Sequence, residues 1–203
     1  MKKLFTIFLV VASCSTAFSQ EKGNFEYGFN VGLNVSGVTV GTNYTSDSKI
    51  GFNVGAFGDY FFSDRWSIKA KLNFDQKGWN GGYFSNNNVG SLTNYRYDYL
   101  TVPVMANWHF GRKRNWYLNF GPYVGFLIDA KETNLDIDLK DLSESIDAGL
   151  ALGIGVKIPV TDKIKILLEV DSQSGLADII KNNQGGSTTN NRSSLNAGFV
   201  FGL

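Results

Sequence analysis

Residues 146–158 read IDAGLALGIGVKI, and this stretch decides the fold. Apolar side chains alternate there with glycine, alanine or charged ones. Successive side chains of a β-strand point to opposite faces of a sheet. The apolar face carries Ala148, Leu150, Leu152, Ile154 and Val156. The stretch therefore predicts a strand with two different surroundings, one apolar and one lined by small and polar groups.

The same alternation occurs in seven other segments. They cover residues 27–38, 50–62, 66–77, 95–110, 116–128, 164–171 and 194–203. A tilted strand needs about 9–11 residues to cross a bilayer. An even number of antiparallel strands can close into a barrel that leaves no unpaired edge in lipid. We predict an all-β fold, an eight-stranded antiparallel up-and-down transmembrane β-barrel over residues 20–203.

The connections between these segments alternate in length. Short links follow the second, fourth and sixth segments, at residues 63–65, 111–115 and 159–163. Loops of roughly ten to seventeen residues, rich in Asn, Gly, Ser and Thr, follow the others. Outer-membrane barrels have short periplasmic turns and long extracellular loops. The pattern predicts a protein of the bacterial outer membrane with both termini in the periplasm.

Aromatic residues gather beside the short links. They are Tyr27, Tyr60, Phe62, Trp66, Trp108, Phe110 and Trp116. Aromatic rings are enriched at the headgroup level of membranes, so these residues predict a girdle at one interface.

The first 19 residues have the pattern of a secretory signal peptide. A basic start and an apolar run precede Ala17-Phe18-Ser19, which predicts cleavage before Gln20. A second processing route stays open, because Val11-Ala12-Ser13-Cys14 resembles a lipobox, in which Cys14 would carry lipid. Cys14 is the only cysteine, so cleavage before Gln20 leaves a mature chain without thiol chemistry.

Charge and composition exclude some functions. The chain has 19 basic and 18 acidic side chains, which gives none of the basic excess of nucleic-acid-binding proteins. A soluble barrel would turn its apolar face inward around a ligand. The polar faces of residues 27–38, 116–128 and 146–158 are mainly Gly, Asn, Ala and Tyr, whereas a solvated face would carry more Lys and Glu. The composition therefore favours a membrane barrel.

Eight charged residues have the alternation of the inward face. They are Asp59, Lys69, Lys71, Asp75, Lys157, Lys165, Glu169 and Asp171. An eight-stranded barrel is just wide enough for its own side chains, and unpaired buried charges are costly. We predict a lumen ion-pair network that fills the barrel and blocks flow. The alternative is a narrow pore or gate for small ions, in which such pairs rearrange.

The sequence predicts no catalytic, cofactor or metal site. The single histidine, His109, is expected at the membrane interface with no chemical role. The acids Asp136, Asp138, Asp141 and Glu144 lack the glycine of an EF-hand loop, and they predict a short amphipathic surface element.

The chain resembles the PorT-like family of small outer-membrane barrels of Bacteroidetes-type bacteria. The resemblance rests on Gly51-Phe52-Asn53-Val54-Gly55, Asp59-Tyr60-Phe61-Phe62-Ser63-Asp64-Arg65, Asp75-Gln76-Lys77-Gly78 and Tyr99-Leu100-Thr101-Val102-Pro103. It covers the whole mature chain. The last strand also resembles the signal read by the barrel-assembly machinery, at Asn196, Gly198, Phe201 and Leu203, although the final residue is more often Phe.

The resemblance implies a non-enzymatic structural or accessory component, with a secretion or surface-assembly system as its setting. The expected partners are outer-membrane lipid, the assembly machinery during biogenesis, and an envelope or secretion protein, with no nucleic acid. A narrow channel for ions or solutes and a lipid-active enzyme are the alternatives.

Overall fold

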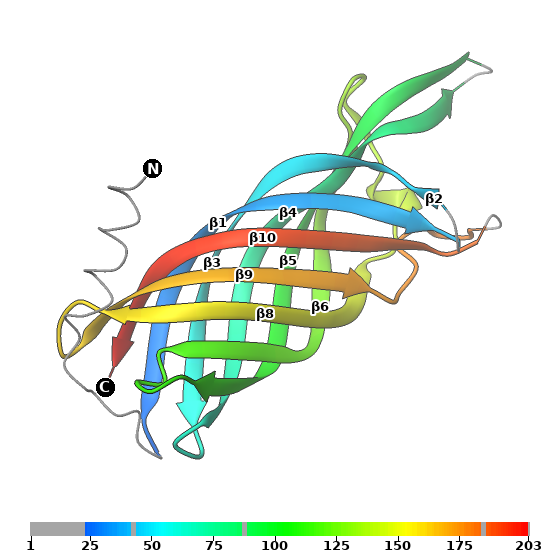
Figure 1. Ribbon diagram of the computed structural model, residues 1–203. Coiled ribbons are helices and arrows are strands. Elements are labelled where there is room, and N and C mark those ends of the chain that lie inside the picture. Colours follow the sequence, from blue (N-terminus) through cyan, green and yellow to red (C-terminus); the bar gives the residue numbers. More distant parts are fainter. Residues whose placement is uncertain (1–22, 42–43, 87–88, 184–185, 203) are drawn as a thin grey trace.

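The computed structural model describes residues 23–41, 44–86, 89–183 and 186–202, and in this part of the chain eight long strands form a closed antiparallel ring (Figure 1). The long strands are β1 (Phe25–Val40), β3 (Asp47–Phe61), β4 (Trp66–Asn86), β5 (Val89–Phe110), β6 (Trp116–Glu132), β8 (Ile146–Pro159), β9 (Ile164–Gly175) and β10 (Thr188–Gly202). Three short elements are β2 (Tyr44–Thr45), β7 (Ile137–Asp138) and the 3-10 helix η1 (Lys140–Leu142). No helix in these ranges has the length and apolarity to cross a membrane. The predicted leader, residues 1–19, and Leu203 lie outside the described residues.

Long strands that follow one another in the sequence pair with one another in space, and the first pairs with the last. The closing ladder joins β1 to β10 from Glu26 opposite Gly202 to Val40 opposite Thr188. Because the ring closes, none of the long strands presents an unpaired edge, as a bilayer requires. The predicted eight-stranded up-and-down barrel is confirmed.

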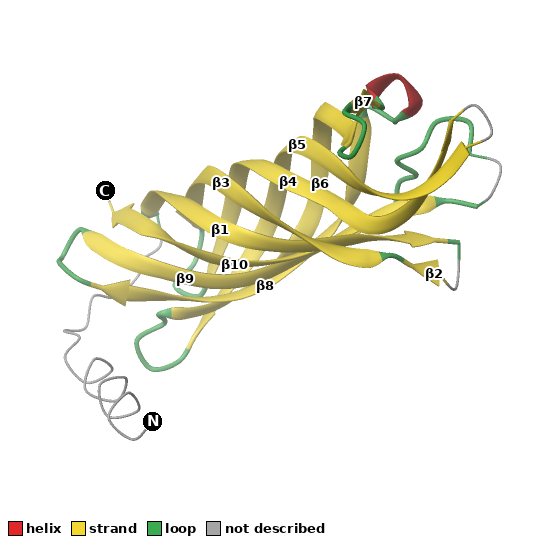
Figure 2. Ribbon diagram, turned by 90° about the horizontal axis from the view of Figure 1, so that it is seen from above, coloured by secondary structure: helices red, strands yellow, loops and turns green. Residues whose placement is uncertain are grey.

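The two ends of the barrel differ in their connections. Residues 62–65, 111–115 and 160–163 join β3 to β4, β5 to β6 and β8 to β9 at one end, which we call the short-turn end. The first residues of β1 and the last of β10 lie at this end too. Figure 2 shows β7 and η1 at the opposite end, the loop end, together with the long β4–β5 hairpin.

The strands run further at the loop end than the alternation predicts. β4 has 21 residues and β5 has 22, so only residues 87–88 separate strands that the sequence pattern placed about 17 residues apart. This hairpin projects beyond the barrel (Figure 1). The predicted strand ends at Lys77 and Tyr95 are wrong, because alternation stops where neither face of a sheet meets lipid. Beyond these positions β4 and β5 still pair, from Gly82 opposite Thr93 to Asn86 opposite Val89, although apolar and polar residues no longer alternate.

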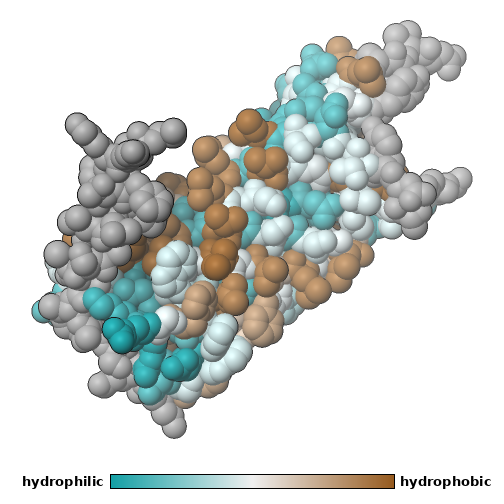
Figure 3. Space-filling model, in the orientation of Figure 1, coloured by the Kyte–Doolittle hydropathy of each residue, from teal (hydrophilic) through white to brown (hydrophobic). Residues whose placement is uncertain are grey.

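Polarity in the barrel is inverted relative to a soluble protein. Most apolar side chains of the long strands point outward, and the outward leucines Leu33 and Leu152 are 63% and 60% exposed. Figure 3 shows apolar residues spread over the middle of one face and hydrophilic ones toward both ends of the barrel. Such a surface on a soluble monomer would promote aggregation. The seven predicted girdle aromatics also face outward beside the short turns.

Lumen glycines make room for large rings from neighbouring strands. A Cβ added to Gly155 would lie 2.3 Å from Oη and 2.4 Å from Cζ of Tyr117, and one added to Gly28 would lie 2.6 Å from Cζ of Phe57. Tyr117 is fully buried, and its hydroxyl is fixed by Glu169 at 2.6 Å. The glycines on the polar face of the pattern therefore serve interior packing.

Gly155→Ala is expected to lower the free energy of unfolding by about 1–3 kcal/mol, the usual cost of overpacking a filled interior. Urea titration of the barrel refolded in vesicles, followed by tryptophan fluorescence, measures this change. Gly202→Ala is the control, because a Cβ at Gly202 meets nothing within 4 Å. Equal stability of the Gly155→Ala variant and the wild type would contradict this packing account.

Candidate functional site

The lumen holds equal numbers of acidic and basic side chains in ion pairs. The acids are Glu26, Asp59, Asp75, Asp147, Glu169 and Asp171, and the bases are Lys69, Lys71, Lys77, Lys157, Lys165 and Arg192. Eleven of these twelve residues are buried, and Lys165 is partly buried with its side chain 13% exposed. With equal numbers of opposite charges, the described interior is electrically balanced.

Glu169 on β9 is the central acceptor of this network. Its Oε2 accepts hydrogen bonds from Lys69 Nζ at 2.8 Å, Tyr117 Oη at 2.6 Å and Asn119 Nδ2 at 2.9 Å. Its Oε1 accepts from Lys71 Nζ. Four donors from β4 and β6 thus converge on one carboxylate of β9, so the contact ties opposite walls of the barrel together.

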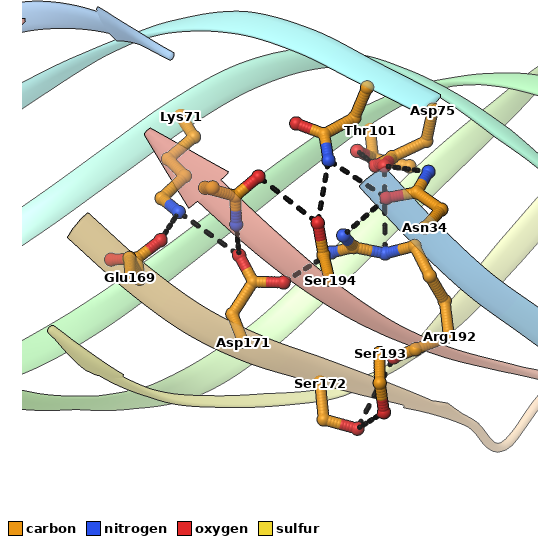
Figure 4. A network of polar contacts seen from close by, with 12 residues as sticks. Asn34, Lys71, Asp75, Thr101, Glu169, Asp171, Ser172, Arg192, Ser193 and Ser194 are labelled. Atoms are coloured by element: carbon orange, nitrogen blue, oxygen red, sulfur yellow. Dashed lines mark hydrogen bonds and ion pairs between the residues drawn. The ribbon is translucent and has the colours of Figure 1, made fainter. Parts of the chain in front are cut away.

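Arg192 on β10 makes the next connection toward the loop end (Figure 4). Its Nη2 lies 2.9 Å from Asp171 Oδ1, and its Nε lies 3.5 Å from Asp75 Oδ1. Asp171 Oδ2 in turn lies 3.2 Å from Lys71 Nζ. Asp75 also accepts hydrogen bonds from Thr101 and from Asn34 Nδ2. The guanidinium therefore bridges carboxylates of β4 and β9.

Two smaller groups occupy the ends of the lumen. At the short-turn end, Lys157 Nζ lies 2.5 Å from Glu26 Oε2 and 2.6 Å from Asp59 Oδ2, and Glu26 also pairs with Lys165. At the loop end, Lys77 Nζ lies 2.9 Å from Asp147 Oδ2.

Aromatic rings fill the space between these charged groups. Lys69 Nζ lies 4.7 Å from the ring centroids of both Phe57 and Tyr117, and Lys77 Nζ lies 4.8 Å from that of Tyr123. A cation over an aromatic face gains attraction from the ring as well as from its carboxylate. Charged and aromatic groups thus fill the lumen together.

All eight charged residues predicted for the lumen network lie in it, and the structure adds four that sequence reasoning missed: Glu26, Lys77, Asp147 and Arg192. Glu26 and Arg192 lie outside the strand ends that the alternation suggested. Lys77 and Asp147 have the inward parity but lie at predicted strand ends. Extending the first and last strands by one or two residues at constant parity would have found Glu26 and Arg192, and counting the inward charges at the ends of residues 66–77 and 146–158 would have found Lys77 and Asp147.

His109 lies inside the barrel, so its predicted interfacial position is wrong. Its ring is fully buried, with Nε2 2.9 Å from Ser67 Oγ and the ring centroid 4.8 Å from that of Phe61. It follows the outward Trp108, and strand alternation turns it inward. In the described part of the chain no hydrogen-bond partner reaches Nδ1, so Ser67 and His109 lack the third group that orients a catalytic histidine.

A cluster of buried, mainly aromatic side chains, which we call the loop-end cap, closes the loop end of the barrel. Its buried residues are Val38, Trp79, Tyr95, Tyr97, Tyr99, Ala130, Leu139 and Ile179. Trp79 stacks on Tyr95 at a centroid distance of 4.6 Å and on Tyr97 at 5.2 Å. Tyr99 meets the lumen network, since its hydroxyl accepts a hydrogen bond from Asn190, which also donates to Asp147. The cap therefore rests directly on the charged interior.

Two loops cross the cap and bond to each other. The backbone N–H of Glu144 donates to the carbonyl of Ile179 at 2.9 Å, and that of Lys181 donates to the carbonyl of Leu142 at 3.0 Å. Ser143 Oγ lies 3.0 Å from Tyr97 Oη. These contacts hold residues 133–145 and 176–183 as one surface.

Glu132, at the end of β6, stabilises the start of the first loop. Burial acts to raise the pKa of this carboxyl, but hydrogen bonds from Thr93 and from the backbone N–H groups of Asn134 and Leu135 lower it below its usual value. Glu132 therefore stays ionised and fixes the turn.

The acidic residues of this loop are on a surface element. Asp138 ends β7 and Asp141 lies in η1, while Leu139 between them is buried in the cap. Residues 23–41, 44–86, 89–183 and 186–202 contain no group of three side chains placed to hold a metal.

Three residues of the expected assembly signal lie in β10. Asn196 faces the lumen and donates to Asp171 at 3.2 Å, while Phe201 stacks on Tyr27 at 5.5 Å beside the β1–β10 seam. Gly198 packs against β1, and Leu203 lies outside the described residues. Recognition by the assembly machinery stays a prediction.

Glu169→Gln is expected to lower the free energy of unfolding by about 3–5 kcal/mol, because Lys69 then loses the carboxylate that balances it in a buried site and Lys71 keeps only Asp171. Asp64→Asn is the control. Its side chain is 63% exposed and lies 3.5 Å from Arg114, so the loss there is about 1 kcal/mol or less. Urea unfolding in vesicles compares the two variants, and similar losses in both would contradict the buried network.

Comparison with known proteins agrees with this geometry. The family model described as "Outer membrane protein beta-barrel domain" matches residues 18–181. The fold is similar to OprG from Pseudomonas aeruginosa, with a TM-score of 0.56, 11% identity, and coverage of 91% of this chain and 98% of that one.

Two other solved structures are similar. Neisserial surface protein A has a TM-score of 0.51, 12% identity, and coverage of 86% and 96% of the two chains. The N-terminal barrel domain of Pseudomonas aeruginosa OprF has a TM-score of 0.50, 13% identity, and coverage of 91% and 100%. At these identities the likeness shows the fold alone. No curated protein matches the chain. From the family match over most of its length, the chain belongs to the outer membrane protein beta-barrel domain family and is a small barrel of the bacterial outer membrane.

Proposed function

We propose that this protein is a closed, non-enzymatic outer-membrane barrel that acts through its loop-end surface as a structural or accessory component. The paired lumen is the observation that carries the proposal. Glu169 and Arg192 join β4, β6, β9 and β10 across the interior, and no charged member of the network reaches bulk water in the middle of the barrel. Conduction would require breaking several buried pairs at once.

The loop-end cap supports the same proposal. A channel needs an open mouth, whereas Trp79, Tyr95 and Tyr97 stack beneath loops that are bonded to each other. An ordered loop surface is suited to binding, because little conformational entropy is lost when a partner docks. Leu135 and Leu142 are 63% and 61% exposed on these loops, which offers apolar anchors to a partner protein.

The absence of enzymatic activity is part of the proposal. Ser67 and His109 are fully buried, so a lipid or peptide substrate has no access to them, and the histidine lacks an acidic partner at Nδ1 among the described residues. A lipid-active site would need both groups open to the membrane or to solvent.

The resemblance to the PorT-like family supplies the setting that we propose, a protein secretion or surface-assembly system. Membership of that narrower group rests on the sequence phrases from residues 51–103. The expected partner is an envelope or secretion protein, bound at the loop end, with the termini in the periplasm.

The wild-type barrel is expected to show no steady conductance in planar bilayers, because its lumen is filled. Arg192→Ala removes the guanidinium that bridges Asp75 and Asp171, and it is expected to produce brief openings. Arg112→Ala, at an exposed turn, is the matched control and should stay closed. Steady conductance of the wild type would contradict the closed barrel and favour the alternative, a narrow channel.

The partner is tested by crosslinking in intact cells of the bacterium of origin. A photoreactive residue at Leu135 or Leu142 is expected to capture the same envelope or secretion protein repeatedly. A photoreactive residue at Leu150, 58% exposed on the lipid-facing wall, is the control and should not capture it. Deletion of the gene should impair secretion or surface assembly. If neither loop position captured a partner protein, and secretion and surface assembly were normal in the deletion strain, the accessory role would be contradicted.

A further inference from the structure

The charges outside the lumen are distributed unevenly between the two ends of the barrel. Two adjacent short turns, residues 62–65 and 111–115, carry four cationic side chains and one carboxylate, Asp64, and the third short turn, residues 160–163, carries Lys163 and Asp162. The four cationic residues of the two adjacent turns are Arg65, Arg112, Lys113 and Arg114, and we call them the basic turn patch. At the loop end, acids outnumber bases among the described residues. The acids there are Asp47, Asp98, Asp129, Glu132, Asp136, Asp138, Asp141, Glu144 and Asp178, and the bases are Lys49, Arg96, Lys131, Lys140 and Lys181.

Backbone and side-chain contacts gather the basic turn patch into one place. Arg114 Nη1 donates to the carbonyl of Asp64 at 3.2 Å and lies 3.5 Å from its carboxylate. The backbone N–H of His109 donates to the carbonyl of Arg65 at 2.7 Å. The two turns are therefore neighbours, and the side chains of Arg65 and Arg112 are exposed.

Aromatic side chains fix the depth of this patch in the membrane. Trp66 lies opposite Trp108 in the β4–β5 ladder, Trp108 stacks on Phe110 at 5.3 Å, and Phe110 lies 6.5 Å from Trp116. The three tryptophans are 37%, 37% and 44% exposed on the outer wall. Tryptophan prefers the headgroup level of a bilayer. The turn 111–115 starts directly after Phe110 and ends directly before Trp116, so its cations lie in the headgroup layer itself.

We propose that the basic turn patch binds anionic phospholipid headgroups and gathers them around the short-turn end of the barrel. Each Lys or Arg at a membrane surface attracts anionic lipid, and the attraction fades over a Debye length of about 10 Å at moderate salt. The girdle keeps the four cations well within that distance of the lipid phosphates. The acidic loop end repels the same lipids, so the uneven charge also favours one orientation, with the short turns at the phospholipid leaflet. This inference is independent of the accessory role.

The test uses the folded barrel in phosphatidylcholine nanodiscs that contain a small, equal fraction of either brominated phosphatidylglycerol or brominated phosphatidylcholine. Bromine on the acyl chains quenches nearby tryptophans. Trp66, Trp108 and Trp116 lie beside the patch, and Trp79→Phe removes the fourth tryptophan at the loop end. Brominated phosphatidylglycerol is expected to quench tryptophan fluorescence more than brominated phosphatidylcholine does, by an amount that corresponds to an enrichment of about threefold or more around the girdle. High salt should make the quenching by the two lipids equal.

The patch variant combines Arg65→Gln, Arg112→Gln and Lys113→Gln, and it keeps Arg114 so that the two turns stay joined. It is expected to quench equally with both lipids. The matched control combines Lys131→Gln, Lys140→Gln and Lys181→Gln at the loop end, which removes the same charge and should keep the preference. Arg65→Lys with Arg112→Lys should keep it as well. Equal quenching by both lipids in the wild type, or an unchanged preference in the patch variant, would overturn the proposal.

Discussion

Charges inside this barrel must pair with one another, because eight strands enclose a lumen too narrow for both side chains and bulk water. Each carboxylate or ammonium group there would be costly alone, and breaking such a pair is strongly destabilising. The network around Glu169, Arg192 and Lys157 meets this constraint with donors from several strands. The same contacts join opposite walls, so they close the lumen and brace the ring of strands.

The rest of the architecture follows from that filled interior. Because charges, amides and aromatic rings occupy most of the lumen, most apolar side chains are available for the outer wall, where lipid surrounds them. Lumen glycines such as Gly155 make space for Tyr117, which donates to Glu169. At the loop end, Tyr99 connects the charged interior to the stacked rings of the cap. A molecule closed in this way offers its surface for function, and that is the basis of the proposed accessory role.

Much of this structure could be predicted from alternation alone. Every second residue of a strand faces lipid, so the alternation of apolar and polar residues identified the barrel, its turns and eight charged lumen residues. This alternation no longer predicts the strands beyond the part of the barrel that lipid surrounds. The β4–β5 hairpin continues beyond the apolar outer wall, where its residues no longer alternate, so its full strands were missed, and Glu26 and Arg192 lay beyond the inferred strand ends. His109 was misplaced because its neighbours Trp108 and Phe110 suggested an interface, although alternation turned it inward. The pairing partners themselves depend on register across the barrel, which a single strand's sequence does not contain.

A double-mutant cycle on Lys77 and Asp147 tests the central claim most directly. Within ion-pairing distance, each is the other's single charged partner among the described residues, and both side chains are at most 1% exposed. The cycle compares the unfolding free energies of Lys77→Met, Asp147→Asn, the double variant and the wild type in the same vesicles. A coupling of about 2 kcal/mol or more is predicted for a pair that the lumen shields from water. A coupling within about 0.5 kcal/mol of zero, the value for independent sites, would contradict a filled and paired interior.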